Sequence, residues 1–140
     1  VRPSKVDAPI GRHKTQRTKM AIRDDGKDAV THYRALEAFE RYSHIELSLQ
    51  TGRTHQIRVH MKHLGFPLIG DPTYGGHFRH PPGKEQNALV KGLLGFPRQA
   101  LHARHLSFVH PLTEEICEFE SPLSDDMADL LGLLRVHARV

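Results

Sequence analysis

The sequence predicts an α+β fold in which helices pack on a mostly antiparallel (mixed) sheet. Residues 44–51 alternate apolar and polar side chains, which is typical of a half-buried strand. Directly after this run, Ile57, Met61 and Leu64 recur at helical spacing, so 54–64 is predicted to be an amphipathic helix with these three side chains in the core. The connections between predicted elements are short, which argues against a doubly wound parallel sheet.

The remaining segments are predicted to be turns, strands and short helices. The length of the chain fits one domain. In chain order these segments are predicted to be a loop or basic arm over 1–18, a turn over 24–28, a strand or a short helix over 29–40, an ordered loop over 67–76, an excursion with a short helix over 79–98, and two strands over 100–111 and 115–121.

The ends of two helices can also be predicted. Thr54 is suited to cap the helix over 54–64, and Gly65 is suited to follow its last turn. Ser124 is predicted to cap a C-terminal helix, whose first turn then contains acids that the helix dipole favours. The buried stripe of this last helix is predicted to be Met127, Leu130, Leu131 and Leu134.

Charge is distributed unevenly along the 140 residues, whose net charge is +4. Residues 1–23 carry seven Lys/Arg against one acid, a net of +6, whereas 24–140 carry thirteen against fifteen, a net of −2. A basic N-terminal segment is typical of an arm that binds RNA or DNA, although a solvated terminus has the same composition. The single cysteine, Cys117, and the lack of a long apolar run predict a cytoplasmic protein without a membrane partner.

The predicted helix over 54–64 carries cations opposite its core face. His55, Arg58 and Lys62 form one row there, and Arg53 lies just before the helix. Arg53, His55 and the unpaired amides of the first turn could together bind an anion. A solvated basic face is the alternative interpretation. Arg58 has no acid three or four residues away, so nothing within the helix neutralises this row.

Twelve histidines also raise the question of a metal site. His55 and His60 are five residues apart and point in different directions, so they cannot easily share one ion. His60 and His63 lie on one face, but no carboxylate follows them in the helix and no H-E-x-x-H pattern is present. The sequence therefore predicts no metal site. A His-rich metal-binding domain is a weaker interpretation than the two given below, an enzyme and a non-catalytic RNA-binding module.

The contiguous stretch TGRTHQIRVHMKHLGFPLIGDPTYGG (51–76) resembles the signature of the RluA/RluD-type RNA pseudouridine synthases. VDAPIGRH (6–13) and RQALHARHLSFVHPLTEE (98–115) are similar to the segments that flank this signature in the family. The excursion, with HPPG and then LLGFPRQALHA, is most similar to the RluD branch, which acts on large-subunit ribosomal RNA. The resemblance covers essentially the whole chain.

The resemblance implies a pseudouridine-synthase-like fold and an isomerase that converts uridine to pseudouridine without a cofactor or metal. The family's nucleophile is an Asp in an H-R-L-D motif, and none of the eight aspartates here follows Arg-Leu. We therefore expect 1–140 to be the C-terminal portion of one catalytic domain, with a basic arm over 1–18 and the sheet and helices over 19–140. The upstream catalytic half and any S4-like domain would be absent, and this fragment alone is predicted to be inactive and to self-associate.

The resemblance also suggests roles for individual residues. Arg58 matches the family's arginine that pairs with the nucleophilic Asp, so its partner is expected upstream of this chain. Arg53 and His55 are expected to contact the phosphate of the flipped nucleotide or the neighbouring backbone. Further phosphate contacts are expected from Arg12, Lys14, Arg17, Lys19 and Lys62. The residues of the motif with expected structural roles are Gly52, Gln56, Gly70, Asp71 and Tyr74. The alternative to an enzyme is a non-catalytic RNA-binding module that uses the same basic face.

Overall fold

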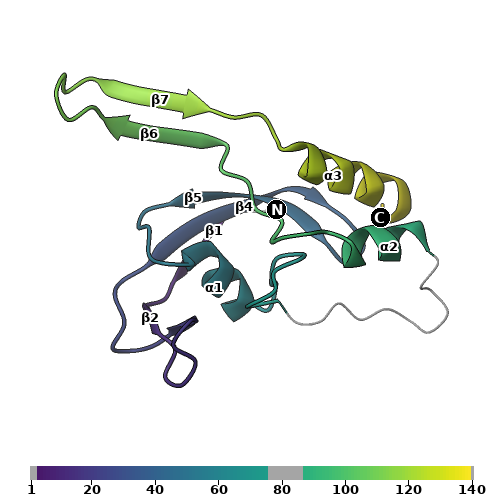
Figure 1. Ribbon diagram of the computed structural model, residues 1–140, viewed down its shortest axis with the longest axis horizontal. Helices are drawn as coiled ribbons and strands as arrows, with labels where there is room; N and C mark the ends of the chain where they lie inside the picture. The colour runs from purple at the N-terminus through teal and green to yellow at the C-terminus, as the bar shows by residue number, and fades with distance from the viewer. Residues whose placement is uncertain (1–2, 76–86, 140) are drawn as a thin grey trace.

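The computed structural model describes residues 3–75 and 87–139. The described chain forms β1 (Ser4–Asp7), β2 (Ile10–Arg12), β3 (Met20–Ile22), β4 (Val30–Ala38), β5 (Ser43–Leu49), α1 (Gln56–His63), α2 (Ala88–Leu94), β6 (His105–Val109), β7 (Ile116–Glu120) and α3 (Asp125–His137). Figure 1 shows these elements as one sheet with helices beside it and two separate hairpins. The predicted α+β class with antiparallel strands is confirmed.

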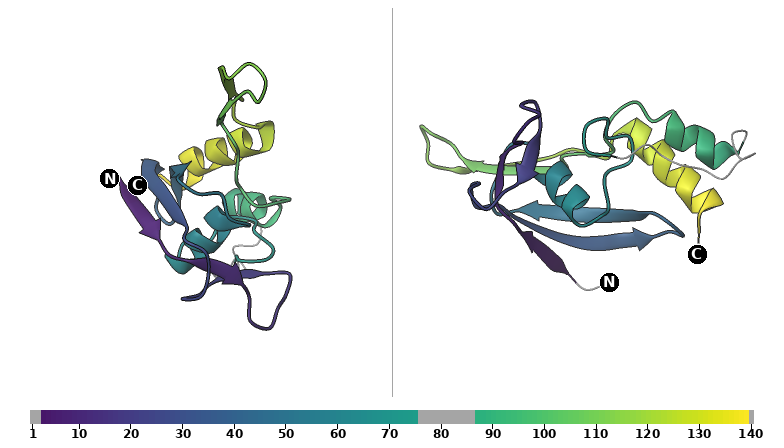
Figure 2. Two further views of the ribbon diagram at one scale, coloured as in Figure 1. Left: turned by 90° about the vertical axis from the view of Figure 1, so that its left-hand side faces the viewer. Right: turned by 90° about the horizontal axis from the view of Figure 1, so that it is seen from below.

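The central sheet has the strand order β1-β4-β5, and both strand pairs are antiparallel. Residues 29–40, which could have been strand or helix, contain the long central strand β4. Helix α1 covers one face of this sheet (Figure 2). Its Met61 packs with Val6 and Ala8 into a core that Ile45 and Leu47 of β5 also join.

A second apolar cluster lies where α1 meets the hairpin of β2 and β3. Ile10, Ala29, Val59 and Tyr74 are its buried members, with relative exposures between 0% and 4%. Ile22 contacts both this cluster and the core under the sheet. The β2–β3 hairpin is therefore part of the folded body next to α1.

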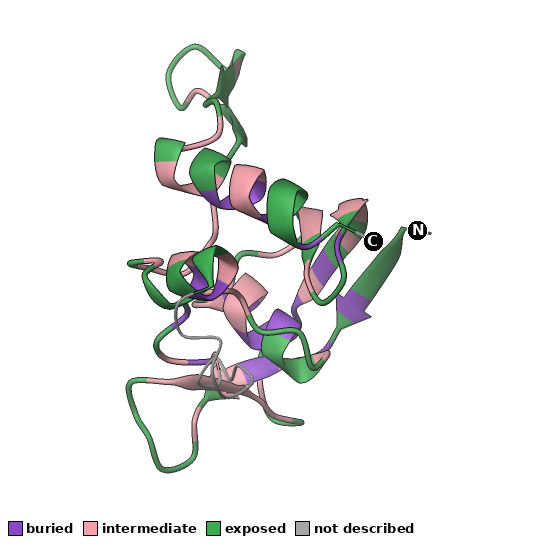
Figure 3. Ribbon diagram, turned by 90° about the vertical axis from the view of Figure 1, so that its right-hand side faces the viewer, coloured by how far each residue is buried: buried purple, intermediate pink, exposed green. Residues whose placement is uncertain are grey.

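Helices α2 and α3 pack against each other beyond the end of β4 (Figure 1). Figure 3 shows the buried stripe of α3, and this stripe confirms most of the predicted one: Leu130, Leu131 and Leu134 are buried and Met127 is partly buried. A side chain larger than hydrogen at Gly92 would overlap Leu133, so glycine permits this close approach.

The hairpin of β6 and β7 projects away from the body, with most of its surface exposed (Figures 1 and 3). Leu106 lies opposite Phe119, and Phe108 lies opposite Cys117, so these four side chains share one face of the hairpin. Leu106, Phe108 and Phe119 remain 59%, 43% and 57% exposed. An isolated two-stranded hairpin is only marginally stable in water, and an exposed apolar face of this kind is typical of an interaction surface. We call these four residues the hairpin face.

Several sequence-based predictions of local structure were wrong. Residues 1–18 are not a plain loop, because β1 pairs with β4 and β2 pairs with β3. Thr54 does not cap α1: His55 occupies the N-cap position, and no side chain caps it. Residues 100–104 precede β6 instead of forming part of it. Of the predicted excursion over 79–98, the helix is confirmed as α2, whereas 79–86, with HPPG, lies outside the described residues.

The predicted core face of α1 was too narrow. Met61 is buried as expected, but Ile57 and Leu64 are only partly buried. Gln56, Val59 and His60 are buried as well. The helix lies between the sheet and the β2–β3 hairpin, so it is enclosed on more than the single stripe that helical periodicity reveals.

Candidate functional site at the start of α1

The turn from β5 into α1 is fixed by one buried amide side chain. Gln56 Oε1 accepts hydrogen bonds from Thr51 Oγ1 (2.8 Å) and from the Arg53 backbone N–H (2.9 Å). Its Nε2 donates to the Val30 carbonyl (3.0 Å) and to Thr31 Oγ1 (2.9 Å). An amide side chain that makes four hydrogen bonds while 3% exposed ties this turn firmly to β4.

A second buried network lies deeper under α1. His60, which is fully buried, donates from Nε2 to the Ala8 carbonyl (2.9 Å), and its Nδ1 accepts from Thr31 Oγ1 (2.7 Å). Burial lowers the pKa of His60, in agreement with this neutral form. Of the three histidines in the motif, His60 is therefore a buried core residue, and both of its ring nitrogens are hydrogen-bonded. The sequence analysis considered it only as a metal ligand.

His55 has an unusual backbone conformation at the start of α1. Its φ of 54° lies in the left-handed region, which costs free energy for a residue with a side chain and is often found at functional sites. The conformation brings His55 Nδ1 to 2.7 Å from the Tyr74 hydroxyl. The same hydroxyl oxygen accepts from the Met20 N–H (2.8 Å), so its hydrogen is available to His55 Nδ1.

These contacts favour a neutral His55. Burial, followed by the nearby charge of Arg58, lowers the pKa of His55, and Asp71 only partly opposes this. With Nδ1 accepting from Tyr74, the proton of the neutral ring is on Nε2. His55 thus offers a hydrogen-bond donor without a full positive charge.

The strongest ion pair of the site joins α1 to the loop that follows it. Arg58 donates from Nε to Asp71 Oδ2 and from Nη2 to Asp71 Oδ1, both at 2.8 Å. Their side chains are 12% and 0% exposed. The guanidinium also lies 4.9 Å from the centre of the Tyr74 ring, within range of a cation–π interaction. A bidentate pair of this kind fixes the orientation of the guanidinium.

Asp71 is held in place from its own side as well. Its Oδ1 accepts from the backbone N–H groups of Thr73 (2.9 Å) and Tyr74 (3.0 Å). Burial raises the pKa of Asp71, but the hydrogen bonds from Arg58 and from these two amides outweigh it and lower the pKa to about 2. Asp71 is consequently ionised at any physiological pH.

The loop around Asp71 is braced by the segment that leads to β6. Gly70 has a φ of 75°, and a Cβ at this position would overlap the carbonyl oxygen of Arg98. The Ala100 N–H donates to the Ile69 carbonyl at 2.8 Å, directly beside this close approach. The position of Asp71 therefore depends on a glycine at residue 70.

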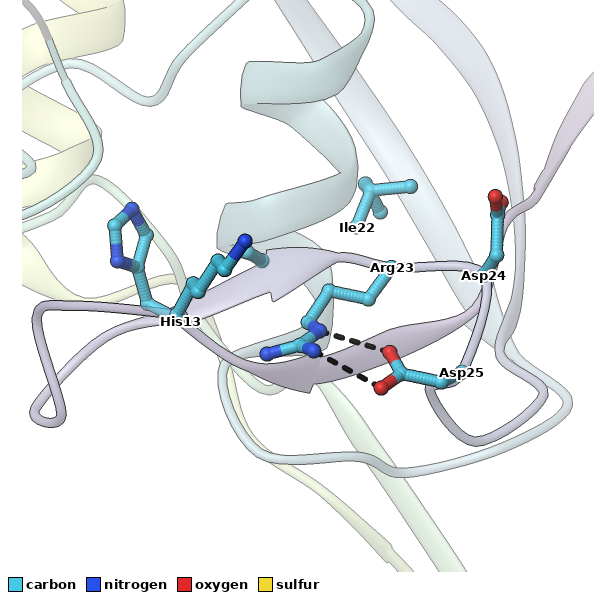
Figure 4. Close-up of a pocket in the computed structure, with 7 residues that line it drawn as sticks. His13, Ile22, Arg23, Asp24 and Asp25 are labelled. Carbon is cyan, nitrogen blue, oxygen red and sulfur yellow. Dashed lines mark hydrogen bonds and ion pairs between the residues drawn. The ribbon is translucent and has the colours of Figure 1, made fainter.

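Four of the predicted RNA-binding cations lie on the β2–β3 hairpin. Arg12, Lys14, Arg17 and Lys19 all belong to β2 or to the connection between β2 and β3. Lys14 is one of the residues that line a pocket on this hairpin, and Figure 4 shows this pocket, where Arg23 pairs with Asp25 at 2.8 Å. The Met20 N–H, at the start of β3, is the contact that ties this hairpin to Tyr74.

The two remaining cations are placed differently. Arg53 donates from Nε to the Asp28 carbonyl (2.8 Å), so one of its guanidinium donors is bonded to the turn before β4. Lys62 is exposed in the last turn of α1, at the opposite end from His55. Gly52 has no atom within 4 Å of where a Cβ would lie, so the structure gives no steric reason for glycine there.

Arg58 has a carboxylate partner within this chain that the sequence analysis did not predict. This partner is Asp71, thirteen residues further on. The contact was missed because only acids within the helix were considered, whereas the turn at Gly70 returns the chain to α1. The structure thus brings His55, Arg58, Asp71 and Tyr74 together.

Two further findings concern other kinds of site. Over 3–75 and 87–139, no three His, Cys, Asp or Glu side chains are grouped so that they could hold a metal ion. Within these same ranges, none of the helices is both long and apolar enough to cross a membrane.

Comparison with known proteins finds similarity to RNA pseudouridine synthases. Residues 2–63 match the family model of RNA pseudouridylate synthase. The ribosomal large subunit pseudouridine synthase D of Pseudomonas aeruginosa is 59% identical over 93% of this chain and 40% of its own length. The protein of the same name from Vibrio parahaemolyticus is 55% identical over 94% of this chain and 40% of its own length.

Two solved structures have the same fold. Human RNA pseudouridylate synthase domain containing 4 aligns with a TM-score of 0.68 and 26% identity, over 95% of this chain and 56% of that one. Human RNA pseudouridylate synthase domain containing 1 aligns with a TM-score of 0.63 and 27% identity, over 99% of this chain and 61% of that one. The chain spans about 40% of the length of the curated relatives it matches. The chain is therefore similar, over nearly its whole length, to part of the RluD-type RNA pseudouridine synthases, in agreement with the resemblance found in its sequence.

Proposed function

We propose that this chain is the C-terminal portion of a longer enzyme that isomerises uridine to pseudouridine in large-subunit ribosomal RNA. The observation that carries the proposal is the 59% identity, over 93% of the chain, to a protein named as a large-subunit pseudouridine synthase. The non-catalytic RNA-binding module is not favoured, because the matched relatives bear the names of enzymes. A cytoplasmic location is part of the proposal and follows from a ribosomal RNA substrate.

The geometry supports a nucleophile outside these 140 residues. Asp71 is the carboxylate at the site, but its two oxygens accept four hydrogen bonds and its side chain is fully buried. A carboxylate bound in this way cannot attack a sugar or base. The reaction needs an ionised Asp near the flipped uridine, and a neighbouring arginine would keep such an Asp ionised. We propose Arg58 for this role.

The surroundings of the site support RNA as the substrate. The cations of the β2–β3 hairpin would contact backbone phosphates without reading sequence, together with Arg53 and Lys62. His55 would donate from Nε2 to the nucleotide that enters the site, since its Nδ1 is occupied by Tyr74.

The proposed activity can be tested with the longer protein and with the 140-residue chain in parallel. The longer protein is expected to form pseudouridine in a large-subunit rRNA transcript, detected by mass spectrometry of the nucleosides. The chain alone is expected to form none, because it lacks the nucleophile. Activity of the chain alone would refute the placement of the nucleophile, and an inactive longer protein would refute the proposed function.

We also propose that the isolated chain associates with a second copy of itself through the hairpin face. The exposed apolar side chains of β6 and β7, with both strand edges unpaired within the described residues, support this. Light scattering is expected to show dimers or larger species that Phe119→Ser shifts toward the monomer. Val136→Ser, which changes an exposed residue of α3, should not have this effect. A chain that is monomeric at high concentration would contradict the proposal.

A further inference from the structure

We propose that Asp71 is a positioning residue for the reaction: it holds Arg58 by its Nε and Nη2 edge and thereby aims the Nη1 end at the anionic group of the active site. This inference rests on the proposed function. It extends that function, because it gives Arg58 two carboxylate partners, Asp71 and the nucleophilic Asp, and assigns a different edge of the guanidinium to each.

The hydrogen bonds of Arg58 define the available edge. A guanidinium has five N–H donors in a fixed plane. Asp71 takes the Nε–H and one Nη2–H in a bidentate arrangement. Among the described residues, Nη1 has no hydrogen-bond partner, and Tyr74 covers one face of the plane. An anion that binds Arg58 in this arrangement is therefore received by the Nη1 end.

The alternative is that Asp71 only occupies Arg58 until the nucleophilic Asp displaces it. The surroundings of Asp71 argue against such an exchange. Its side chain is fully buried, and the amides of Thr73 and Tyr74 keep it where it is. Moving Arg58 away would leave an ionised, buried carboxylate without its cation, which is strongly unfavourable.

The positioning role has a consequence for charge. Arg58 and Asp71 are together neutral, so a second carboxylate meets a rigid hydrogen-bond donor within an ion pair and not a free cation. Preorganised donors of this kind stabilise developing charge without having to reorient during the reaction. The reaction then depends on the orientation of the Arg58 hydrogen-bond donor, and not on the net charge of the pair alone.

The first test is Asp71→Asn in the longer protein. Asparagine can still accept from the Thr73 and Tyr74 amides, but its NH₂ group cannot receive both Arg58 donors. Positioning predicts that kcat falls by about 100-fold while KM changes by less than about threefold. If Asp71 merely competes with the nucleophile, kcat would stay the same or increase, which would overturn the inference.

Glu37→Gln is the matched control. Glu37 also binds an arginine, Arg135, through both carboxylate oxygens. This pair joins β4 to α3 and includes no residue of α1 or of the loop around Asp71. This variant should keep the kcat of the wild type, so a general effect of losing an ion pair can be recognised.

The second test does not depend on activity. The Arg58 Nε–H signal in a nitrogen-15 NMR spectrum of the longer protein, assigned by its loss in Arg58→Lys, should show a hydrogen-bonded proton with and without an rRNA transcript. Loss of this signal's protection on adding RNA would mean that Arg58 leaves Asp71, and would overturn the inference. If the wild type proves inactive, the proposed function fails, and the NMR result still decides whether Asp71 keeps Arg58.

Discussion

Replacing Arg58 with alanine is expected to lower the free energy of unfolding of the chain by about 3–5 kcal/mol at neutral pH. The substitution leaves the Asp71 carboxylate buried and without its cation, because the side chain is fully inaccessible and only two amides remain bonded to it. Urea denaturation followed by circular dichroism measures the change. A loss below about 1 kcal/mol, typical of exposed pairs, would show that the pair is effectively solvated.

The pH dependence gives this prediction a signature. In the wild type, the pKa of Asp71 is about 2, below its unfolded value, so its contribution is present above about pH 4 and is lost as the pH falls toward 2. Without Arg58, burial is expected to raise the pKa of Asp71 above its unfolded value. The variant is then destabilised at a pH above this raised pKa, where Asp71 must ionise, and it loses this destabilisation at a lower pH, where Asp71 is protonated. The difference between the two proteins should therefore shrink on acidification, and a difference that is independent of pH would contradict the assignment.

Arg23→Ala is the matched control for Arg58→Ala. Arg23 also forms an ion pair with an aspartate, Asp25, but the two side chains are 35% and 70% exposed. Water solvates both charges there, so the loss should stay below about 1 kcal/mol. The contrast between the two variants isolates the effect of burial from the effect of losing an arginine.

Replacing Gly70 with alanine is the second substitution with a large expected effect. Its positive φ strains any other residue, and the added Cβ would overlap the Arg98 carbonyl oxygen, so the loop must shift. We expect a loss of roughly 2–4 kcal/mol in the free energy of unfolding, measured by urea denaturation. Asp71, the next residue, would move with the loop.

Gly52→Ala provides the comparison within the same motif. A Cβ at Gly52 has no neighbour within 4 Å, and this glycine is not among those with positive φ. Alanine there is expected to leave stability unchanged or to raise it by up to about 1 kcal/mol, since it restricts the unfolded chain. Equal losses for the two variants would show that the close approach at Gly70 is not the cause.

Elements encoded by local periodicity could be predicted from the sequence. The change from alternation to helical spacing located β5 and α1, and the apolar stripe located α3. Strands β1 and β2 could not be predicted in this way, because they are short and their pairing depends on partners elsewhere in the chain, such as Thr31 opposite Val6. Propensity over three or four residues is too weak to reveal such pairing.

The candidate site was predicted in part. Resemblance to the family drew attention to Arg58, Asp71 and Tyr74, but it did not show that Arg58 and Asp71 bind each other. A helical wheel compares only residues within one helix, and this contact crosses a turn. The left-handed conformation of His55 was also missed, because no pattern in the sequence marks a histidine for positive φ.

The Tyr74 hydroxyl has a consequence for the order of folding. It joins the Met20 amide, 54 residues earlier in the chain, to His55 at the start of α1. Contacts between distant residues require closing a long loop, which costs more conformational entropy than forming a local turn or helix. The hydrogen bonds of helix α1 join nearby residues, whereas this junction can be completed only after the β2–β3 hairpin has docked. We therefore expect the geometry of the site to form late in folding.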